Sequence, residues 1–167
     1  MKAIYLLVFL LFSGCAYQPT SHFAKKELEG NVFVKLFIDL KDPQNAVLIK
    51  DSLNELILQK LDAKLVHNES YADTVMYVKL NSVNMTELQY DKFGYNKLYR
   101  ATVEILVEYT KKETAVKKSF TVSGEHNFSI DDGTTITGTK RFEAIKEASD
   151  DALDEVLSKI AVSSFKK

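Results

Sequence analysis

Residues 99–109, YRATVEILVEY, carry the most regular pattern in the sequence. Their odd-numbered positions, from Tyr99 to Tyr109, are all apolar or aromatic, and polar residues stand at most of the positions between them. Successive side chains of a β-strand point to opposite faces of a sheet. This period of two therefore predicts a strand with one face in the core and the other toward water or a partner.

The sequence before this strand predicts a first strand and a helix. Residues 31–40 alternate in the same way, although Phe33 and Phe37 on the second face indicate that both faces are partly covered. The pair Asp42-Pro43 is typical of a helix start, because the carboxylate can cap free N–H groups and proline fits the first helical position. Apolar residues then follow at helical spacing and predict a helix over about 43–61.

The remaining elements form three strands and a closing helix. Residues 75–80 alternate clearly, but the pattern weakens over 81–90, which predicts a bulge or an exposed strand end there. A turn over 91–96 leads into the regular strand, and residues 116–127 return beside it. Apolar residues at a spacing of three and four predict a last helix over about 139–163.

The predicted order of elements is β-α-β-β-β-α within a single domain of residues 31–167. A right-handed crossover through the first helix would put both helices on one face of the sheet. We therefore predict an α+β fold of the two-layer sandwich type, in which two helices pack on one face of a mainly antiparallel four-stranded sheet.

Composition describes an ordinary globular chain and excludes some classes of function. The chain has 167 residues, 46% of them hydrophobic, and a formal net charge of -1. Such a balance offers no overall positive field for nucleic acid, so we expect no nucleic-acid partner. A single cysteine is too few for a Cys-based zinc or iron-sulfur site, and the three histidines are isolated from one another.

The first residues have the features of an export signal. Lys2 is followed by ten uncharged, mostly apolar residues, 3–12, which are far fewer than the roughly 20 needed to span a bilayer. Residues 12–15, Phe-Ser-Gly-Cys, resemble the bacterial lipobox, although that motif usually has leucine at the position of Phe12. We therefore predict that residues 1–14 are a lipoprotein signal peptide that is removed.

The cysteine is then the predicted membrane anchor. The lipobox resemblance implies that Cys15 carries an S-diacylglycerol group and an N-acyl chain, and two or more acyl chains hold a protein stably on a membrane. The alternative is a buried or free thiol. Ala16 stands where aspartate often retains lipoproteins in the inner membrane, which favours the outer membrane. Residues 15–30 are predicted to be the lipidated N-terminus and a polar tether.

A search for catalytic motifs gives no credible site. G-x-S-x-G, P-loop and H-E-x-x-H patterns are all missing, so we predict no catalytic residue, no bound metal and no cofactor other than the lipid. His126 lies an odd number of positions from Ser123 and Ser129, which puts them on opposite faces of a strand. Asn127 lies in a stretch similar to an acidic glycosylation sequon, but short motifs of this kind often occur by chance.

Arginine usage points to a candidate ligand site. Only two of the 22 basic residues are arginines, and arginine matches phosphate oxygens in a bidentate way. Arg100 follows Lys92 and Lys97 around an aromatic-rich turn, whereas Arg141 lies beside Lys140 at the start of the last helix. These five residues could hold a phosphorylated ligand. Alternatively, Arg100 pairs with Glu104 or a neighbouring strand, and Arg141 is solvated.

Several of these features together resemble a known family. They are a lipobox cysteine followed by Tyr17, the Asp42-Pro43 helix start, a long strand, the Lys92-Phe93-Gly94 loop, and the strand from Tyr99 to Val103. The set resembles the lipopolysaccharide-assembly lipoprotein family LptE. The resemblance implies an outer-membrane lipoprotein that lies in the lumen of the β-barrel LptD, assists its folding and binds lipopolysaccharide. It also implies lipopolysaccharide contacts at Lys92, Lys97 and Arg100, whereas Lys140 and Arg141 come from the arginine argument alone.

The sequence therefore predicts a non-enzymatic plug and ligand-binding subunit. Its expected partners are LptD, lipopolysaccharide and the membrane that holds its lipid, on the periplasmic side of the outer membrane within the translocon. The leading alternative is another anchored interaction module, such as the auxiliary lipoprotein of a lipid ABC transporter. A small anchored hydrolase would need a nucleophile and a base in one pocket, and the sequence offers no such pair.

Overall fold

The computed structural model describes residues 24, 26–38, 43–61, 64–90, 92–131 and 134–163. In chain order the elements are β1 (Asn31–Ile38), α3 (Pro43–Leu61), β2 (Lys64–Leu65), the 3-10 helix η1 (Glu69–Tyr71), β3 (Thr74–Tyr90), β4 (Asn96–Lys111), β5 (Lys117–Ser129) and α4 (Gly138–Ser163). The predicted helices over 43–61 and 139–163 match α3 and α4 closely. The signal peptide, Cys15 and the cap Asp42 lie outside the described residues.

The strands form one mixed sheet in the order β2-β1-β3-β4-β5. β1 runs parallel to both of its neighbours, and β3, β4 and β5 pair antiparallel in sequence. The α+β class is confirmed, but the predicted four-stranded, mainly antiparallel sheet is in fact a five-stranded mixed sheet, because β2 adds a second parallel pair. The crossover through α3 makes β1 parallel to β3, and the two residues of β2 are too few to show a period.

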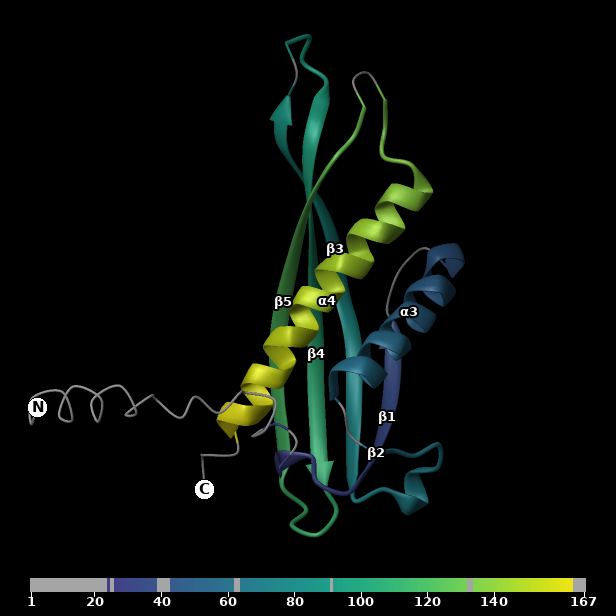
Figure 1. The fold of residues 1–167 in the computed structure, drawn as a ribbon, viewed down its shortest axis with the longest axis vertical. Helices are drawn as coiled ribbons and strands as arrows, with labels where there is room; N and C mark the ends of the chain where they lie inside the picture. The colour runs from purple at the N-terminus through teal and green to yellow at the C-terminus, as the bar shows by residue number, and fades with distance from the viewer. Residues whose placement is uncertain are drawn as a thin grey trace, which may run out of the picture.

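Both helices lie across the same face of a curled sheet (Figure 1). They meet where Lys60 of α3 reaches Asp150 and Asp154 of α4, with Nζ 3.0 and 2.8 Å from their Oδ1 atoms. On the covered face, the odd-numbered side chains of β4 from Tyr99 to Tyr109 are buried, as predicted. The opposite face of this strand carries mainly polar side chains. The core therefore lies between the sheet and the two helices.

The weak pattern of β3 reflects a change of register. Its pairing with β4 shifts between Leu80 and Ser82 and again near Glu87, and its last residues are exposed. Both parts of the prediction for residues 81–90, a bulge and an exposed strand end, are confirmed. A bulge bends a strand and increases its twist, so it helps to curl the long β3–β4 hairpin.

α4 approaches β5 so closely that one position has room only for glycine. A Cβ atom placed on Gly124 would lie 2.0 Å from the carbonyl oxygen of Ala148 and 2.4 Å from the nitrogen of Ala152. Small residues on both elements therefore let the helix backbone rest directly on the strand. Because the positions beneath the helix are buried, this contact fixes the position of α4 along the sheet.

Side chains of α4 also bind the free edge of β5. The main-chain nitrogen of Ser123 donates to Glu155 Oε2 at 3.2 Å, and that of Glu125 donates to Asp151 Oδ2 at 3.0 Å. Lys159 Nζ donates to the carbonyl oxygen of Thr121. Side chains spaced four residues apart along α4 thus bind main-chain groups spaced two residues apart along β5. This edge is occupied without a further strand.

The segment before β1 is part of the folded domain rather than a tether throughout. Residues 15–30 were predicted as a lipidated N-terminus and tether, and the structure describes Ala24 and residues 26–30 of this range. Ala24 and Leu28 are 1% and 2% exposed and belong to the hydrophobic core. Two apolar residues in a polar stretch are too few to show a period, so the sequence pattern missed this contact. Within the described residues, no helix combines the length and apolar character needed to cross a bilayer.

Candidate functional site

The β3–β4 hairpin forms one end of the molecule (Figure 1). Its strands have 17 and 16 residues, and their distal parts extend beyond the region that the helices cover. Gly94 turns the chain with a φ of +85°, which glycine adopts without strain. The predicted loop of Lys92, Phe93 and Gly94 therefore lies at the tip of the hairpin.

Large apolar side chains are exposed at this tip, which we define as Leu88, Tyr90, Phe93 and Tyr95. Phe93 is 73% exposed, and the other three are between 40% and 57% exposed. Lys92 Nζ lies 4.9 Å from the centre of the Phe93 ring, a cation–π distance. The tip therefore presents aromatic surface together with positive charge, which suits a ligand that has both apolar and anionic parts.

Arg100 supports the base of the hairpin. Its Nε donates to Asn127 Oδ1 at 2.9 Å, and its Nη1 lies 2.8 Å from Glu125 Oε2. Both partners come from β5, so the predicted alternative of a neighbouring-strand partner is what the structure shows, rather than pairing with Glu104. The sequence did not point to Glu125, because cross-strand pairs depend on a register that periodicity alone does not fix.

The second pair of candidate residues lies at the start of α4. Lys140 and Arg141 are exposed in the first helical turn, where the side chain of Thr137 accepts a hydrogen bond from the Lys140 nitrogen at 3.3 Å. The loop before α4 is joined to the hairpin, because the Ile130 nitrogen donates to the Lys97 carbonyl oxygen at 3.1 Å. The hairpin and the first turn of α4 therefore face the same end of the molecule (Figure 1).

A partly buried ionic cluster lies at the other end of β4, and nothing in the sequence analysis indicated it. The carboxylate of Glu27 receives Lys118 Nζ at 2.7 Å and Lys111 Nζ at 3.1 Å, and the Tyr109 hydroxyl donates to it at 3.3 Å. The Tyr109 hydroxyl and Ser163 Oγ are 2.6 Å apart, and Lys118 also donates to the Ser163 carbonyl. The cluster joins the N-terminal segment, two strands and the end of α4. Glu27 and Lys118, which share a hydrogen bond, are 91 residues apart in the sequence. No local sequence pattern therefore reveals the cluster.

The charges of this cluster shift the pKa values of its members. Burial alone would raise the pKa of the Glu27 carboxyl, but hydrogen bonds and charges from Lys118 and Lys111 outweigh burial and hold it below its usual range. Burial also raises the pKa of the Tyr109 hydroxyl. The cluster therefore holds Glu27 as a carboxylate and Tyr109 as a neutral donor, which is a structural arrangement of charges.

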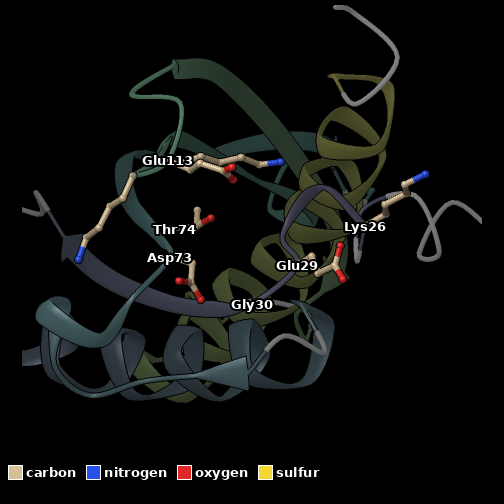
Figure 2. A pocket seen from close by; sticks show the side chains of 8 residues that line it. Lys26, Glu29, Gly30, Asp73, Thr74 and Glu113 are labelled. Atoms are coloured by element: carbon tan, nitrogen blue, oxygen red, sulfur yellow. The ribbon is translucent and has the colours of Figure 1, made fainter.

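A hollow of about 350 Å³ lies beside this cluster, where the N-terminal segment enters β1. Figure 2 shows Asp73 and Thr74 within it and the side chain of Lys26 extending away from it. Asp73 Oδ2 accepts a hydrogen bond from the Asn31 nitrogen at 2.7 Å, and Gly30 has a φ of +97° beside it. The lining residues carry both signs of charge. Asp73 therefore closes a turn, and the hollow has no nucleophile and base arranged for catalysis.

Within the part of the chain that the structure describes, no group of three or more His, Cys, Asp or Glu residues is arranged to hold a metal ion. The hairpin tip with its exposed aromatic residues is the candidate binding surface.

Comparison with known proteins identifies the fold and the family. The structure resembles the rare lipoprotein B from Shewanella oneidensis with a TM-score of 0.53 and 15% identity, covering 80% of this chain and 97% of that chain. A hypothetical protein from Chlamydia trachomatis also gives a TM-score of 0.53, at 7% identity, covering 83% of this chain and 99% of that chain. No curated protein sequence matches the chain. The family model of LptE, described as lipopolysaccharide-assembly, matches residues 33–160. This match begins within β1 and extends through nearly all of α4, and the chain therefore belongs to the non-enzymatic lipopolysaccharide-assembly family LptE.

Proposed function

We propose that this protein is an outer-membrane lipoprotein that plugs the β-barrel translocon LptD, assists its folding and binds lipopolysaccharide. The family match over 33–160 is the observation that carries the proposal. The exposed aromatic residues of the hairpin tip and the lysine beside them support a role in contacting an amphipathic ligand.

The short chain segment between Cys15 and the folded domain is consistent with this proposal. Cys15 is nine residues before Ala24, and nine residues span at most about 30 Å even when fully extended. Because Ala24 is buried in the core and Glu27 binds Lys118 near the β4–β5 turn, a lipid on Cys15 would keep that turn close to the membrane. The 16 residues of β4 separate the turn from the hairpin tip by roughly 50 Å. The tip would then extend away from the lipid anchor.

Recognition of lipopolysaccharide would combine two kinds of contact at the tip. Lysine ammonium groups attract lipid A phosphates through charge-assisted hydrogen bonds, and the exposed rings pack against apolar chains. Lys92 and Lys97 are the candidate cations of the hairpin, and Lys140 and Arg141 could extend the same surface. Arg100 supports the hairpin through β5 and serves as a positioning residue rather than as the main phosphate ligand.

Affinity purification tests the proposed partner. We expect a C-terminally tagged protein to recover a large outer-membrane β-barrel in stoichiometric amount from detergent-solubilised envelopes. Cys15→Ala, which cannot be acylated on sulfur, should reduce recovery if the anchor guides the protein to the barrel. Recovery of inner-membrane transporter subunits, or of no partner, would contradict the proposal and favour the alternative of a lipid ABC transporter component.

Charge reversal at the tip tests direct ligand binding. Lys92→Glu together with Lys97→Glu should weaken binding of purified lipopolysaccharide at least about tenfold at low salt, because two attractive contacts become repulsive. Lys64→Glu is a matched control, since Lys64 is exposed in β2, outside the hairpin. Equal binding by the tip variant and the control would remove these two lysines from the binding site.

A further inference from the structure

The two edges of the sheet differ in how they are protected. The edge of β5 is bound by side chains of Asp151, Glu155 and Lys159 from α4. The edge of β1 pairs with β2 only at Asn31 and Val32. In the described part of the chain, no strand continues this pairing along residues 34–38. One edge is therefore bound by helix side chains over residues 121–125. Among the described residues, the other edge has no strand partner over residues 34–38.

The open edge presents main-chain hydrogen-bonding groups. The Val66 nitrogen donates to the Val32 carbonyl oxygen at 2.9 Å, so the main-chain groups of Val32 point toward β2. The direction of these groups alternates along a strand, and those of Val34, Leu36 and Ile38 therefore point to the same edge. The odd-numbered residues between them point toward β3, with which β1 pairs along residues 32–38.

Side chains beside the edge are also suited to an added strand. Val34, Leu36 and Ile38 are half-buried and pack against the core, so one more strand would cover their remaining apolar surface. On the other face, Lys35 Nζ lies 5.3 Å from the centre of the Phe37 ring, which is 44% exposed. A neighbouring residue on that face would meet a positive charge and an aromatic ring. An acidic or aromatic side chain fits such a position.

We propose that residues 34–38 of β1 bind an extended segment of a protein partner by β-strand addition. The segment would carry aliphatic residues on the face toward α3 and an acidic or aromatic residue opposite Lys35. The inference rests on the proposed function, because it assigns this segment to the β-barrel partner. Main-chain hydrogen bonds would supply affinity, and the alternating side chains would set the register.

The chain's own N-terminal segment fits this edge less well. Ala24 and Leu28 are held in the core, and Glu27 is bound to Lys118 of β5, so the chain enters the fold beside the opposite edge of the sheet.

A second copy fits less well too. Antiparallel pairing of two β1 edges would turn the long axes of the two molecules in opposite directions. Their N-terminal segments would then lie at opposite ends, whereas lipid anchors at Cys15 would place both segments at one membrane.

Amide hydrogen exchange resolved to single residues tests the inference on the full mature protein, alone and in the purified barrel complex. In the dilute free protein, the amides of Val34, Leu36 and Ile38 should exchange at least about tenfold faster than those of Lys35 and Phe37. In the complex, the three open-edge amides should slow at least about tenfold. Protection already present in the dilute free protein, or protection that grows with its concentration, would overturn the inference in favour of an intramolecular or second-copy occupant.

The same experiment separates this inference from the proposed function. If the complex forms but the three amides exchange as fast as in the free protein, strand addition is overturned and the proposed function stands. If no barrel is recovered, both proposals fail.

A pair of variants at one position tests the contribution of the main chain. Leu36→Pro removes the N–H that points to the open edge, and proline is tolerated on edge strands where that group has no partner. Leu36→Val keeps the N–H and an aliphatic side chain. We expect the proline variant to bind the barrel at least about tenfold more weakly than the valine variant, with equal circular dichroism of the free proteins. Equal binding by the two folded variants would overturn the inference.

Discussion

Gly124 shows how one missing side chain determines the packing of two elements. Its backbone conformation is an ordinary strand conformation, so the requirement for glycine comes from Ala148 and Ala152 of α4 rather than from the local φ. A glycine inside a strand pattern usually indicates weak strand propensity, a bulge or a close approach, and the sequence alone does not distinguish them. The tertiary contact decides which of these applies here.

Substitution of this glycine should destabilise the domain. Gly124→Ala would place a methyl carbon 2.0 Å from a main-chain oxygen and 2.4 Å from a main-chain nitrogen of α4, so the helix must move. We expect a loss of about 3 kcal/mol in the free energy of unfolding, measured by urea denaturation. Gly138→Ala is the control, because a Cβ there meets nothing within 4 Å and should change stability by less than about 1 kcal/mol. Equal stability of the two variants would contradict the close contact.

Glu27 is the residue whose charge most clearly contributes to the fold. Its side chain is 10% exposed and contacts two lysine ammonium groups, so removal of its charge would leave Lys111 and Lys118 without their shared carboxylate. Sequence analysis placed this residue in a tether, because nothing near it in the chain identifies partners that lie more than 80 residues away.

Loss of the Glu27 charge should change the pH dependence of stability. The pKa of the folded carboxyl lies below its ordinary value of 4.5, so its stabilising effect is complete above that value and is lost as the pH falls through the folded-state pKa. We expect Glu27→Gln to lower the free energy of unfolding by about 2 kcal/mol at pH 7 and by much less at pH 3. Urea denaturation at pH 7 and at pH 3 measures the two losses. Glu113→Gln, at an exposed position, is the control. A difference between wild type and Glu27→Gln that stays constant with pH would contradict the assigned ion pairs.

At the scale of elements, α4 both covers β5 and occupies its hydrogen-bonding edge. Exposed strand edges promote association between proteins, and native folds commonly cover them with charged side chains or helices. The spacing of Asp151, Glu155 and Lys159 along α4 matches the spacing of alternate residues along β5. The helix therefore protects the edge as well as the core.

Removal of the two carboxylates should expose this edge. The double variant Asp151→Ala, Glu155→Ala leaves the main-chain nitrogens of Ser123 and Glu125 without their acceptors. We expect a loss of about 1–2 kcal/mol in stability and faster aggregation on mild heating, followed by light scattering. Glu147→Ala, an exposed position of the same helix, is the control and should aggregate like the wild type. A double variant that aggregates no faster than this control would show that the edge needs no such protection.

The elements could be predicted from sequence where a period repeats over enough residues. The strand from Tyr99 to Tyr109 and both long helices follow from spacing alone, and the weak pattern of residues 81–90 indicated the bulge in β3. β2 was missed because two residues form no period, so the second parallel pair, between β1 and β2, could not be predicted. At the candidate site, the exposed hairpin could be predicted, but the partners of Arg100 on β5 required the register.

The whole molecule has two chemically different ends. The hairpin tip carries exposed rings, and the opposite end holds the Glu27 cluster and the start of the described chain (Figure 1). The long β4 strand connects them, so a lipid attached before Ala24 would place one end near the bilayer and the other away from it.

Quenching of fluorescent labels at the two ends tests this orientation in the anchored protein. Acylation of Cys15 would leave only an introduced cysteine to react, either Val116→Cys in the β4–β5 turn or Tyr95→Cys at the tip, both at exposed positions. On lipid vesicles that contain a headgroup quencher, we expect the label at position 116 to be quenched at least twofold more than the label at 95. The two labels should respond equally to a soluble quencher. Stronger membrane quenching at position 95 would reverse the proposed orientation.

The Glu27 cluster also has a consequence for the order in which the chain folds. Glu27 is made early during synthesis, but Lys118 lies 91 residues later and Ser163 lies in the last turn of α4. Contacts of such long sequence separation carry a large loop-closure entropy and form slowly. The N-terminal segment is thus expected to close onto the domain only after the final helix has been made. A newly made chain would therefore remain incompletely folded until α4 has been synthesised.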